Sequence, residues 1–340
     1  MELHEAKDEL DFILGKGEQG LCSGDTVVTI FGGTGANFLA GLLERAQAIG
    51  ATIYRTAPNN LKRFRDERNY DKKDDANTLV EMFRLHPELF HQARAQDRAV
   101  FRLRVSYMNW SNAQRLRILA ENHIDTHVKE RAFLDAASFT SQQQTLEQLI
   151  EAEKARDETL KFLRKQEGAL KRVIGKSLKG IPIWDQYLDD ILGVGPSIAS
   201  QIIVTVGDIA RFTSVAAFCK FCGQHCDAKG KFPRNRRGEA SDWNNIARQA
   251  FYLLRQQFVY QKDPEWGRKY RDNLARLNVK HPEPVMVENE KGKKVKRYTK
   301  AHLNKMALIK TCHQFCVKLW KEWRRLEGLP TRSPAEVKSA

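Results

Sequence analysis

The middle of the chain contains a long stretch without the residues that break helices. No proline occurs between Pro87 and Pro182, and no glycine between Gly50 and Gly168. Because proline and glycine cost most in a helix interior, their absence favours long uninterrupted helices. Gln, Glu, Arg and Leu, which are good helix formers, are frequent in the same stretch. We therefore predict that long helices form the centre of this protein.

Apolar residues in this stretch predict that helices pack together. They follow three- and four-residue spacing at Leu146, Leu149, Leu160, Leu163, Leu170 and Ile174. This spacing places them on one side of a helix, although Glu153, Arg156 and Glu167 interrupt the seam. We predict an imperfect coiled coil or a helical hairpin over residues 96–180, which serves as a dimerisation arm rather than as a catalytic element.

Residues 1–95 alternate between predicted strands and helices. The runs "TVVTIF" and "ATIYRTA" indicate buried strands, and "ANFLAGLLERAQAIG" indicates a helix that ends at Gly50. A β-α-β unit of this kind gives a parallel sheet. The turn "FGGTGANF" is a connector rather than a nucleotide cradle. Phe38 stands where a dinucleotide fingerprint has its third glycine, and the Lys-Ser/Thr pair of a P-loop is absent.

The segment "IWDQYLDDILGVGPSIASQIIVTV" predicts two helices joined by a tight turn. Gly193 and Gly195 form the turn, and Pro196 suits the first turn of the second helix. In a helix-hairpin-helix, the hairpin amides and the following helix N-terminus receive a phosphate. An ordinary helical hairpin with a glycine stop is the alternative interpretation.

The charge balance indicates a polyanionic partner. The chain has 57 Lys and Arg residues against 42 Asp and Glu residues, a formal net charge of +15. Basic side chains displace the counterions that condense on nucleic-acid phosphates. Two basic clusters, residues 229–237 and 290–300, favour a nucleic-acid-binding face over a solvated basic surface. The predicted phosphate contacts in the first cluster are Lys229, Lys231, Arg234, Arg236 and Arg237.

Composition argues against a membrane protein or a secreted one. No run of about 18 apolar residues occurs, and the N-terminal segment is acidic and polar rather than a charged-then-apolar leader. Six cysteines are too few for a disulfide scaffold in a chain of 340 residues. We predict a cytoplasmic protein.

Two groups of side chains have the chemistry of metal ligands. Asp71, Asp74 and Asp75 are close enough to share one side of a helix and converge on a divalent ion, although aspartates at a helix start also act as caps. The segments "CKFCGQHC" (219–226) and "TCHQFC" (311–316) could together complete a tetrahedral zinc site. Buried core cysteines are the alternative, and we expect them rather than zinc.

Together these segments resemble the insertion-sequence-110/116/902 transposases, which are bridge-RNA-guided serine recombinases related to Piv-type DNA invertases. The segment "ILGVGPSIASQIIVTVGDIARFTSVAAFCKFCGQ" resembles the family pattern "IPGIGPxTAxxLLxxIGDxxRFxxxxxxAAYAGL". "SDWNNIARQAFYLL" is similar to the family's "SKxGNxxLRxALY" helix, and "DKKDDANTL" is similar to its "KTDxxDAxxLA" segment.

The resemblance implies a protein of α/β and helical structure in three parts. These are a RuvC-like domain over 1–95 whose first strand is cut short, a coiled-coil arm over 96–180, and a C-terminal transposase domain with a helix-hairpin-helix over 181–330. In this family four acids bind magnesium, a serine forms a covalent link to DNA, and a structured RNA pairs with donor and target DNA. The implied partners are therefore DNA, a structured guide RNA and further copies of the chain, as a dimer or tetramer. Mg²⁺ is the implied cofactor of an active enzyme.

The residues that would carry this chemistry match the family incompletely. His4 and Gly32 stand where the family has two of its acids, and Lys229 takes the place of the serine. A start codon chosen too late would explain His4 but neither Gly32 nor Lys229. The catalytic candidates that remain are Asp71, Asp74, Asp75 and Ser241. We therefore expect a transposase-like DNA-binding protein, with a catalytically inactive, transposase-derived DNA- or RNA-binding protein as the alternative.

Overall fold

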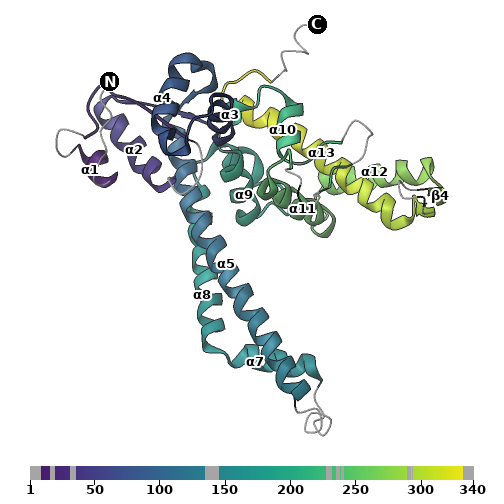
Figure 1. Ribbon diagram of the computed structural model, residues 1–340. Helices are drawn as coiled ribbons and strands as arrows, with labels where there is room; N and C mark the ends of the chain where they lie inside the picture. Colours follow the sequence, from purple (N-terminus) through teal and green to yellow (C-terminus); the bar gives the residue numbers. More distant parts are fainter. Residues whose placement is uncertain are drawn as a thin grey trace.

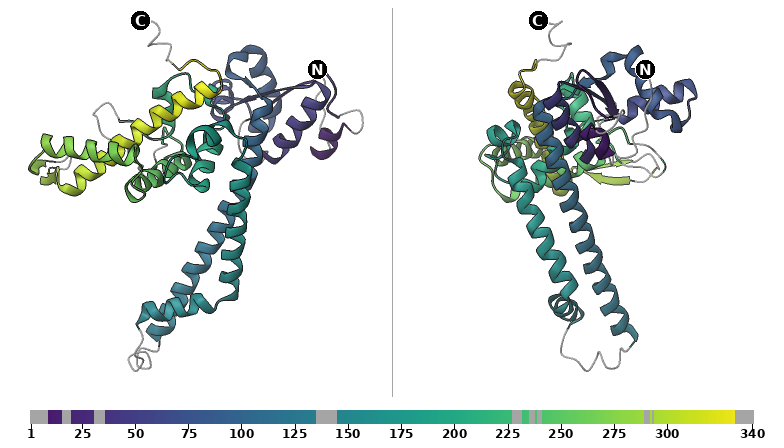
Figure 2. Two further views of the ribbon diagram at one scale, coloured as in Figure 1. Left: turned by 180° about the vertical axis from the view of Figure 1, so that it is seen from behind. Right: turned by 90° about the vertical axis from the view of Figure 1, so that its left-hand side faces the viewer.

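The computed structural model is mostly helical and has three parts (Figure 1). It describes residues 9–15, 20–30, 36–134, 145–226, 232–234, 238, 241–288, 292 and 294–331. An N-terminal α/β unit and a C-terminal helical body lie side by side, and a helical arm projects from them (Figures 1 and 2). The predicted combination of α/β and helical structure is confirmed, whereas a RuvC-like topology of the first part stays a prediction.

The N-terminal part is built around a small sheet. Its elements are α1 (Glu9–Leu14), β1 (Thr26–Ile30), α2 (Ala36–Ile49), β2 (Thr52–Thr56) and β3 (His91–Gln92). As predicted, β1 and β2 run parallel and α2 connects them, while β3 pairs with β2 in the antiparallel direction. Leu42, Leu43 and Ile53 are buried in the core that α2 and the sheet share.

A second small core follows the sheet. Its elements are α3 (Pro58–Arg68), the 3-10 turn η1 (Lys72–Asp74), α4 (Asp75–Leu85) and the 3-10 turn η2 (Pro87–Leu89). Pro58 is the first residue of α3, where a backbone N–H has no hydrogen-bond partner within the helix. Proline, which lacks this N–H, therefore costs no helical hydrogen bond there. Asn69 ends the helix in the left-handed conformation, with φ of 54°. Leu61, Phe64 and Met82 are buried in this second core.

The arm is a helical hairpin. Its elements are α5 (Ala95–Leu134), α7 (Leu146–Arg156) and α8 (Glu158–Leu178). α5 runs outward, α7 turns at the far end, and α8 returns beside α5 (Figure 2). Ile124, Val128, Ile150 and Leu160 form a core near that end. The predicted long helices are therefore confirmed, whereas assembly of copies through the arm stays a prediction.

Ion pairs explain how the arm tolerates charges in its apolar seam. Arg117 Nε lies 2.5 Å from Glu167 Oε2, and Arg117 Nη1 lies 2.6 Å from Glu121 Oε2. Glu153 pairs with Arg131 at 3.7 Å. The Arg117–Glu167 pair joins α5 to α8, and the Arg131–Glu153 pair joins α5 to α7, so these two pairs connect the sides of the hairpin.

The C-terminal body is a layer of helices around an aromatic core. Its elements are the π-helical turn η3 (Trp184–Leu188), α9 (Pro196–Val206), η4 (Ile209–Arg211), α10 (Val215–Phe221), α11 (Asn245–Tyr260), α12 (Trp266–Lys280), β4 (Val285–Glu288), β5 (Lys294–Arg297) and α13 (Lys300–Leu326). Phe251, Phe258, Trp266 and Phe315 contact one another in the core. The first helix of the predicted hairpin is shorter than expected, because a single π-helical turn precedes Asp189.

One buried arginine joins all three parts. Arg55 on β2 donates through Nη2 to Asp97 Oδ2 and to Asp208 Oδ2, both at 2.9 Å. Asp97 lies in the first turn of α5, and Asp208 follows α9. The three residues are only 3%, 7% and 6% exposed. Because a buried charge is stable only when it is paired, this ion triad fixes the sheet, the arm and the body relative to one another.

Substitution of the central arginine should destabilise the whole fold. Arg55→Met removes the cation and leaves two aspartates buried together, which should lower the free energy of unfolding by about 3–5 kcal/mol. The matched control is Arg63→Met on α3, where the side chain is 77% exposed, and it should change stability by about 0.5 kcal/mol or less. Urea denaturation measures both variants, and equal stabilities would contradict the role of the triad.

Candidate nucleic-acid interface

The three predicted magnesium ligands lie in the link between α3 and α4. Asp71 Oδ1 accepts a hydrogen bond from the Lys73 amide at 3.0 Å and so caps η1. Asp75 Oδ1 lies 2.6 Å from Arg65 Nη1, whereas Asp74 is exposed. Across the described ranges, no three His, Cys, Asp or Glu side chains stand ready to hold a metal ion. Two of the three aspartates thus already serve partners within the protein.

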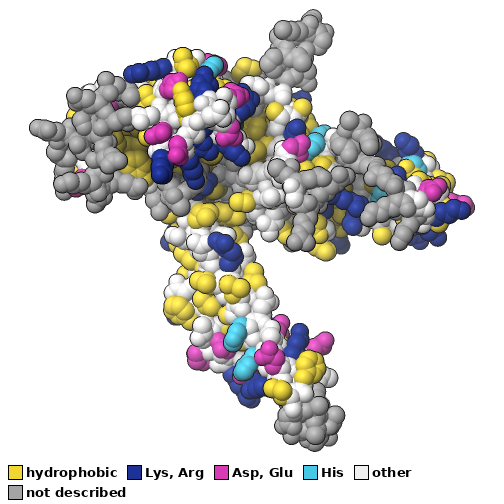
Figure 3. All heavy atoms as spheres, in the orientation of Figure 1, with side chains coloured by type: hydrophobic (Ala, Val, Ile, Leu, Met, Phe, Trp, Pro, Cys, Tyr) yellow, Lys and Arg dark blue, Asp and Glu magenta, His cyan; other side chains and the backbone are white. Residues whose placement is uncertain are grey.

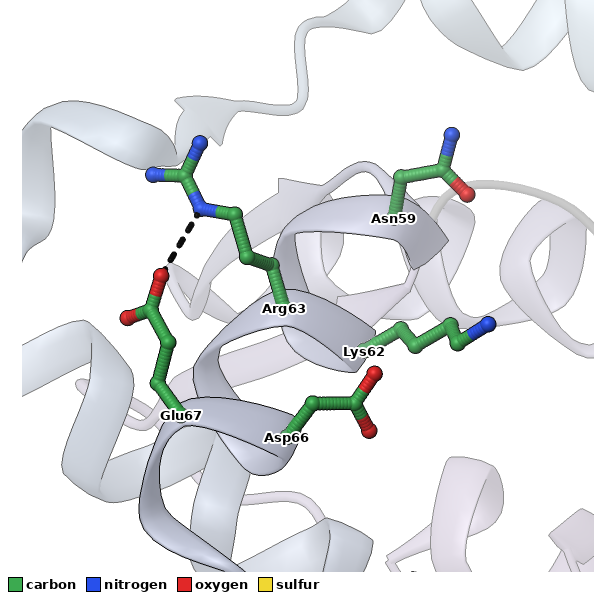
Figure 4. A pocket seen from close by; sticks show the side chains of 5 residues that line it. All are labelled: Asn59, Lys62, Arg63, Asp66 and Glu67. Atoms are coloured by element: carbon green, nitrogen blue, oxygen red, sulfur yellow. Dashed lines mark ion pairs between the residues drawn. The ribbon is translucent and has the colours of Figure 1, made fainter.

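A shallow depression of about 520 Å³ lies on the surface of α3. Figure 4 shows its lining residues, Asn59, Lys62, Arg63, Asp66 and Glu67. All five belong to one helix, and Arg63 is paired with Glu67 at 3.3 Å. A depression lined by a single helix has no opposing wall, so it does not suit an enclosed small-molecule ligand.

The glycine turn before α9 is held against the body. Gly193 has a φ of 96°, and a Cβ atom there would lie 2.7 Å from Gln257 Cβ on α11. The Leu192 amide donates to Asp263 Oδ2 at 3.1 Å. By contrast, Gly195 is exposed and has open space where a Cβ would lie. The turn therefore presents the N-terminus of α9, whose first amides have no partner within the helix, at the surface.

The first basic cluster lies only partly within the described residues. Arg234 is described and exposed. The predicted phosphate contacts outside the described residues are Lys229, Lys231, Arg236 and Arg237, and the family-matched positions His4 and Gly32 lie outside them too. Arg248 on α11 anchors the described piece, because its Nη2 donates to Pro233 O at 2.5 Å.

Two aromatic rings reinforce this anchor. The Arg248 guanidinium lies 4.3 Å from the centroid of the Trp243 ring and 4.8 Å from that of Phe232. Cation–π contacts of this kind contribute about 0.5–2 kcal/mol each. Arg248 thus contacts both the 232–234 segment, which includes Arg234, and Trp243, which lies two residues after Ser241.

The predicted nucleophile Ser241 lies beside an ionic group. Its Oγ donates to the Trp243 carbonyl at 3.4 Å. The neighbouring Asp242 lies 3.0 Å from Lys220 Nζ and 3.7 Å from His225 Nε2. The hydrogen bond from Lys220 holds the pKa of the Asp242 carboxyl below its ordinary value. A serine nucleophile needs a group that accepts its proton, whereas Ser241 Oγ donates to a backbone carbonyl.

The described part of the second basic cluster includes strand β5, which lies beside stacked rings. β4 and β5 pair antiparallel, and Lys294 and Lys296 are exposed on β5. His281 and Tyr298 stack with ring centroids 3.7 Å apart, and the rings of Tyr298 and His302 stack at 5.7 Å. Burial, together with Arg297 and Lys305, lowers the pKa of His302. The lowered pKa favours a neutral His302 ring at neutral pH, which stacks beside the positive charges of the hairpin.

The free end of the body carries several basic side chains. Figure 3 shows Lys and Arg side chains there among hydrophobic and acidic ones, at the end formed by α12, α13 and the β4–β5 hairpin. Sequence analysis identified the lysines of this hairpin but missed the ring stack, because His281 and Tyr298 come from separate elements. It also missed Arg248, whose role depends on contacts that only the fold creates.

Comparison with known protein families matches residues 185–271 to the family described as "Transposase IS116/IS110/IS902 family". Comparison with curated proteins finds no match. The matched segment includes the Gly193–Gly195 turn, Ser241 and Arg248, and it supports a role in transposition or recombination. The C-terminal part of the predicted resemblance is therefore confirmed.

No helix in the described ranges is long and apolar enough to cross a membrane.

The two glycines of the turn should respond differently to alanine. Gly193→Ala places a Cβ against Gln257 in a conformation that costs about 1–3 kcal/mol for other residues, so the free energy of unfolding should fall by that amount. Gly195→Ala meets open space at an ordinary φ of −77° and should change stability by about 0.5 kcal/mol or less. Chemical denaturation compares them, and a stable Gly193→Ala variant would show that the turn is not held against α11.

Proposed function

We propose that this protein binds DNA through its C-terminal body and acts in DNA transposition or site-specific recombination. The family match over residues 185–271 is the observation that carries the proposal. The net charge of +15 supports it, because a surplus of this size favours a polyanionic partner. Within this function, the exposed turn at Gly195 and the N-terminus of α9 receive a DNA phosphate, and Arg234 contacts the backbone nearby.

A structured RNA is the second nucleic-acid partner in this proposal. The stacked rings of His281, Tyr298 and His302 lie beside the basic β4–β5 hairpin. Unpaired RNA bases stack on aromatic side chains, while basic residues hold the RNA backbone. The β4–β5 hairpin lies at the free end of the body, away from α9 (Figure 1), so it offers RNA a contact area separate from the proposed DNA-binding turn.

The arm provides the contact between copies of the chain. Met108, Leu116 and Leu119 are exposed on α5, and Phe162 and Val173 are exposed on α8. Figure 3 shows hydrophobic side chains along the visible face of the arm. Exposed apolar rows on paired helices are typical of helix-packing interfaces. We assign assembly into a dimer or tetramer to this surface.

Strand exchange would use Ser241 as the nucleophile. Its Oγ attacks a DNA phosphorus, the P–O bond to the leaving strand breaks, and the Oγ proton passes to a general base. Mg²⁺ is the metal that an active form would use, held by Asp71, Asp74 and Asp75. As they stand these residues do not fit that role, because Asp75 is paired with Arg65 and Asp71 caps η1. We therefore assign no step to the metal.

The alternative function is binding of DNA or RNA without strand exchange. The engagement of Asp71 and Asp75 by partners within the protein favours it. The hydrogen bond from Ser241 to the Trp243 carbonyl favours it too, because this bond points the nucleophile at its own backbone. DNA binding through the glycine turn and the basic surfaces needs none of these groups.

A covalent link to DNA distinguishes the two functions. If the protein is a recombinase, incubation with its copurified RNA and target DNA should give a protein–DNA adduct that resists denaturing electrophoresis. Ser241→Ala should abolish the adduct, whereas Thr213→Ala, an exposed hydroxyl in the same body, should retain it. Absence of an adduct from the wild type, together with tight nucleic-acid binding, would leave only the binding function.

Nucleic-acid affinity should depend steeply on salt. Each phosphate contact in B-DNA contributes about −0.9 to the slope of log K against log salt concentration. The double variant K294Q/K296Q should make this slope less steep by up to about 1.8. Lys161→Gln is the control, because Lys161 lies on the arm and is paired with Glu158 at 2.7 Å. Fluorescence anisotropy from low to high salt measures the slopes, and affinity without salt dependence would refute a basic binding surface.

A further inference from the structure

Three arginines are buried among the described residues, and one of them has no hydrogen-bonding partner there. Arg55, Arg324 and Arg255 are only 3%, 7% and 8% exposed. Arg55 pairs with two aspartates, and Arg324 donates to the carbonyl oxygens of Phe212 and Pro330. Arg255, on α11, forms no ion pair with a described residue, and its Nε is buried without a hydrogen-bond partner. Because a buried charge is stable only when it is paired, Arg255 needs an anion that the described residues do not supply.

A second arginine on the same side of α11 is in a similar position. Arg248 precedes Arg255 by seven residues, or about two helical turns, so the two side chains leave one face of the helix about 10.5 Å apart. Arg248 is half-buried, has no ion pair within the described ranges, and its Nη1 is buried without a hydrogen-bond partner. Burial lowers the pKa of Arg248, and the charge of Arg255 lowers it further. The two positive charges therefore share one environment.

The carboxylate that acts on Arg248 already has other partners. Asp242 raises the pKa of Arg248, which is opposite to the effect of Arg255. Its Oδ2, however, lies 3.0 Å from Lys220 Nζ, and its Oδ1 lies 3.7 Å from His225 Nε2. Because these neighbours engage the carboxylate, the described residues leave the charges of Arg248 and Arg255 without an anion of their own.

Aromatic rings contact both guanidinium groups. The guanidinium of Arg255 lies 4.4 Å from the centroid of the Tyr252 ring, and that of Arg248 lies 4.3 Å from the centroid of Trp243. A cation–π contact uses the flat face of a guanidinium, whereas its N–H donors lie in its plane and bind phosphate oxygens in pairs. Tyr252 is 50% exposed, so Arg255 lies against a ring that reaches the surface. The rings thus orient the two cations and leave donors for an anion.

We propose that Arg248 and Arg255 form a binding site for backbone phosphates of DNA. Phosphates supply the anions that both guanidinium groups lack, and bidentate contacts between arginine and phosphate are among the stronger hydrogen bonds. A DNA strand has a phosphate about every 3.4 Å along the helix axis, so side chains about 10.5 Å apart suit two phosphates of one strand. This inference rests on the proposed function, in which the body binds DNA.

The surroundings of the arginine pair favour DNA over RNA. Arg248 donates through Nη2 to Pro233 O at 2.5 Å, next to the exposed Arg234 that contacts DNA in the proposed function. α11 packs against α9 and holds the glycine turn through Gln257. The ring stack proposed for RNA lies beyond α11, at the free end of the body (Figure 1). The pair therefore belongs to the proposed DNA surface.

Removal of one charge should weaken DNA binding without weakening the fold. Arg255→Met keeps the apolar stem and removes the cation. For duplex DNA of mixed sequence, the dissociation constant should rise about tenfold at low salt, and the slope of log K against log salt concentration should become less steep by about 0.9. Urea denaturation without DNA should give the wild-type midpoint or a higher one, because the variant no longer buries an unpaired charge. Fluorescence anisotropy measures the binding.

Three further variants serve as controls. Arg164→Met makes the same change on the arm, where Arg164 pairs with Glu121 at 2.9 Å, and it should leave affinity and slope unchanged. Arg255→Lys keeps the charge and should keep the wild-type slope, which separates loss of charge from loss of folding if Arg255→Met is unstable. The double variant R248M/R255M should reduce the slope by about 1.8.

The outcomes separate this site from the proposed function. Unchanged affinity and slope in Arg255→Met, an equal loss in Arg164→Met, or a reduced slope in Arg255→Lys would overturn the arginine pair as a phosphate site. A loss of affinity for single-stranded RNA, with duplex DNA unaffected, would reject DNA as the occupant. A wild-type protein that binds no DNA would refute the proposed function itself and this site with it.

Discussion

The desolvation of Arg55 is the constraint on which the arrangement of this protein depends. A guanidinium that is 3% exposed needs anions on both sides, and its two aspartates come from the start of the arm and from the body. Three structural parts therefore meet at one charge. A well-packed apolar contact could hold them as tightly, but it would not specify which residues must meet.

The body around this junction acts as a rigid support for short functional segments. Its aromatic core fixes α11, α12 and α13, and these helices position the glycine turn, the Arg248 anchor and the ring stack. Binding residues are commonly carried on loops that a packed scaffold positions. In this protein the scaffold residues Arg248 and Gln257 are half-buried, whereas Gly195 and Arg234 are exposed.

The sequence predicted the parts of the fold that depend on local patterns of residues. The absence of helix breakers predicted α5, the apolar spacing predicted the hairpin with α8, and alternating runs predicted the parallel β1–β2 pair. It did not predict the burial and pairing of Arg55, because the residues around this arginine do not indicate partners that are distant in the sequence. It overestimated the helix before Gly193, since the packing of Trp184 and Leu188 into the core accompanies a π-helical turn there. For the site, the glycine turn and basic clusters were visible in sequence, whereas Arg248 depends on contacts made by the fold.

The long sequence separation within the ion triad also sets an order of events during synthesis. Arg55 and Asp208 are 153 residues apart. At about 5–20 residues per second, roughly 8–30 s pass between their emergence from the ribosome. Until Asp208 arrives, the guanidinium has only Asp97 as a carboxylate partner, and water has to take the place of the second. The ion triad that completes the N-terminal unit therefore forms only after the arm has been synthesised. The last partner of the N-terminal sheet comes from the C-terminal body.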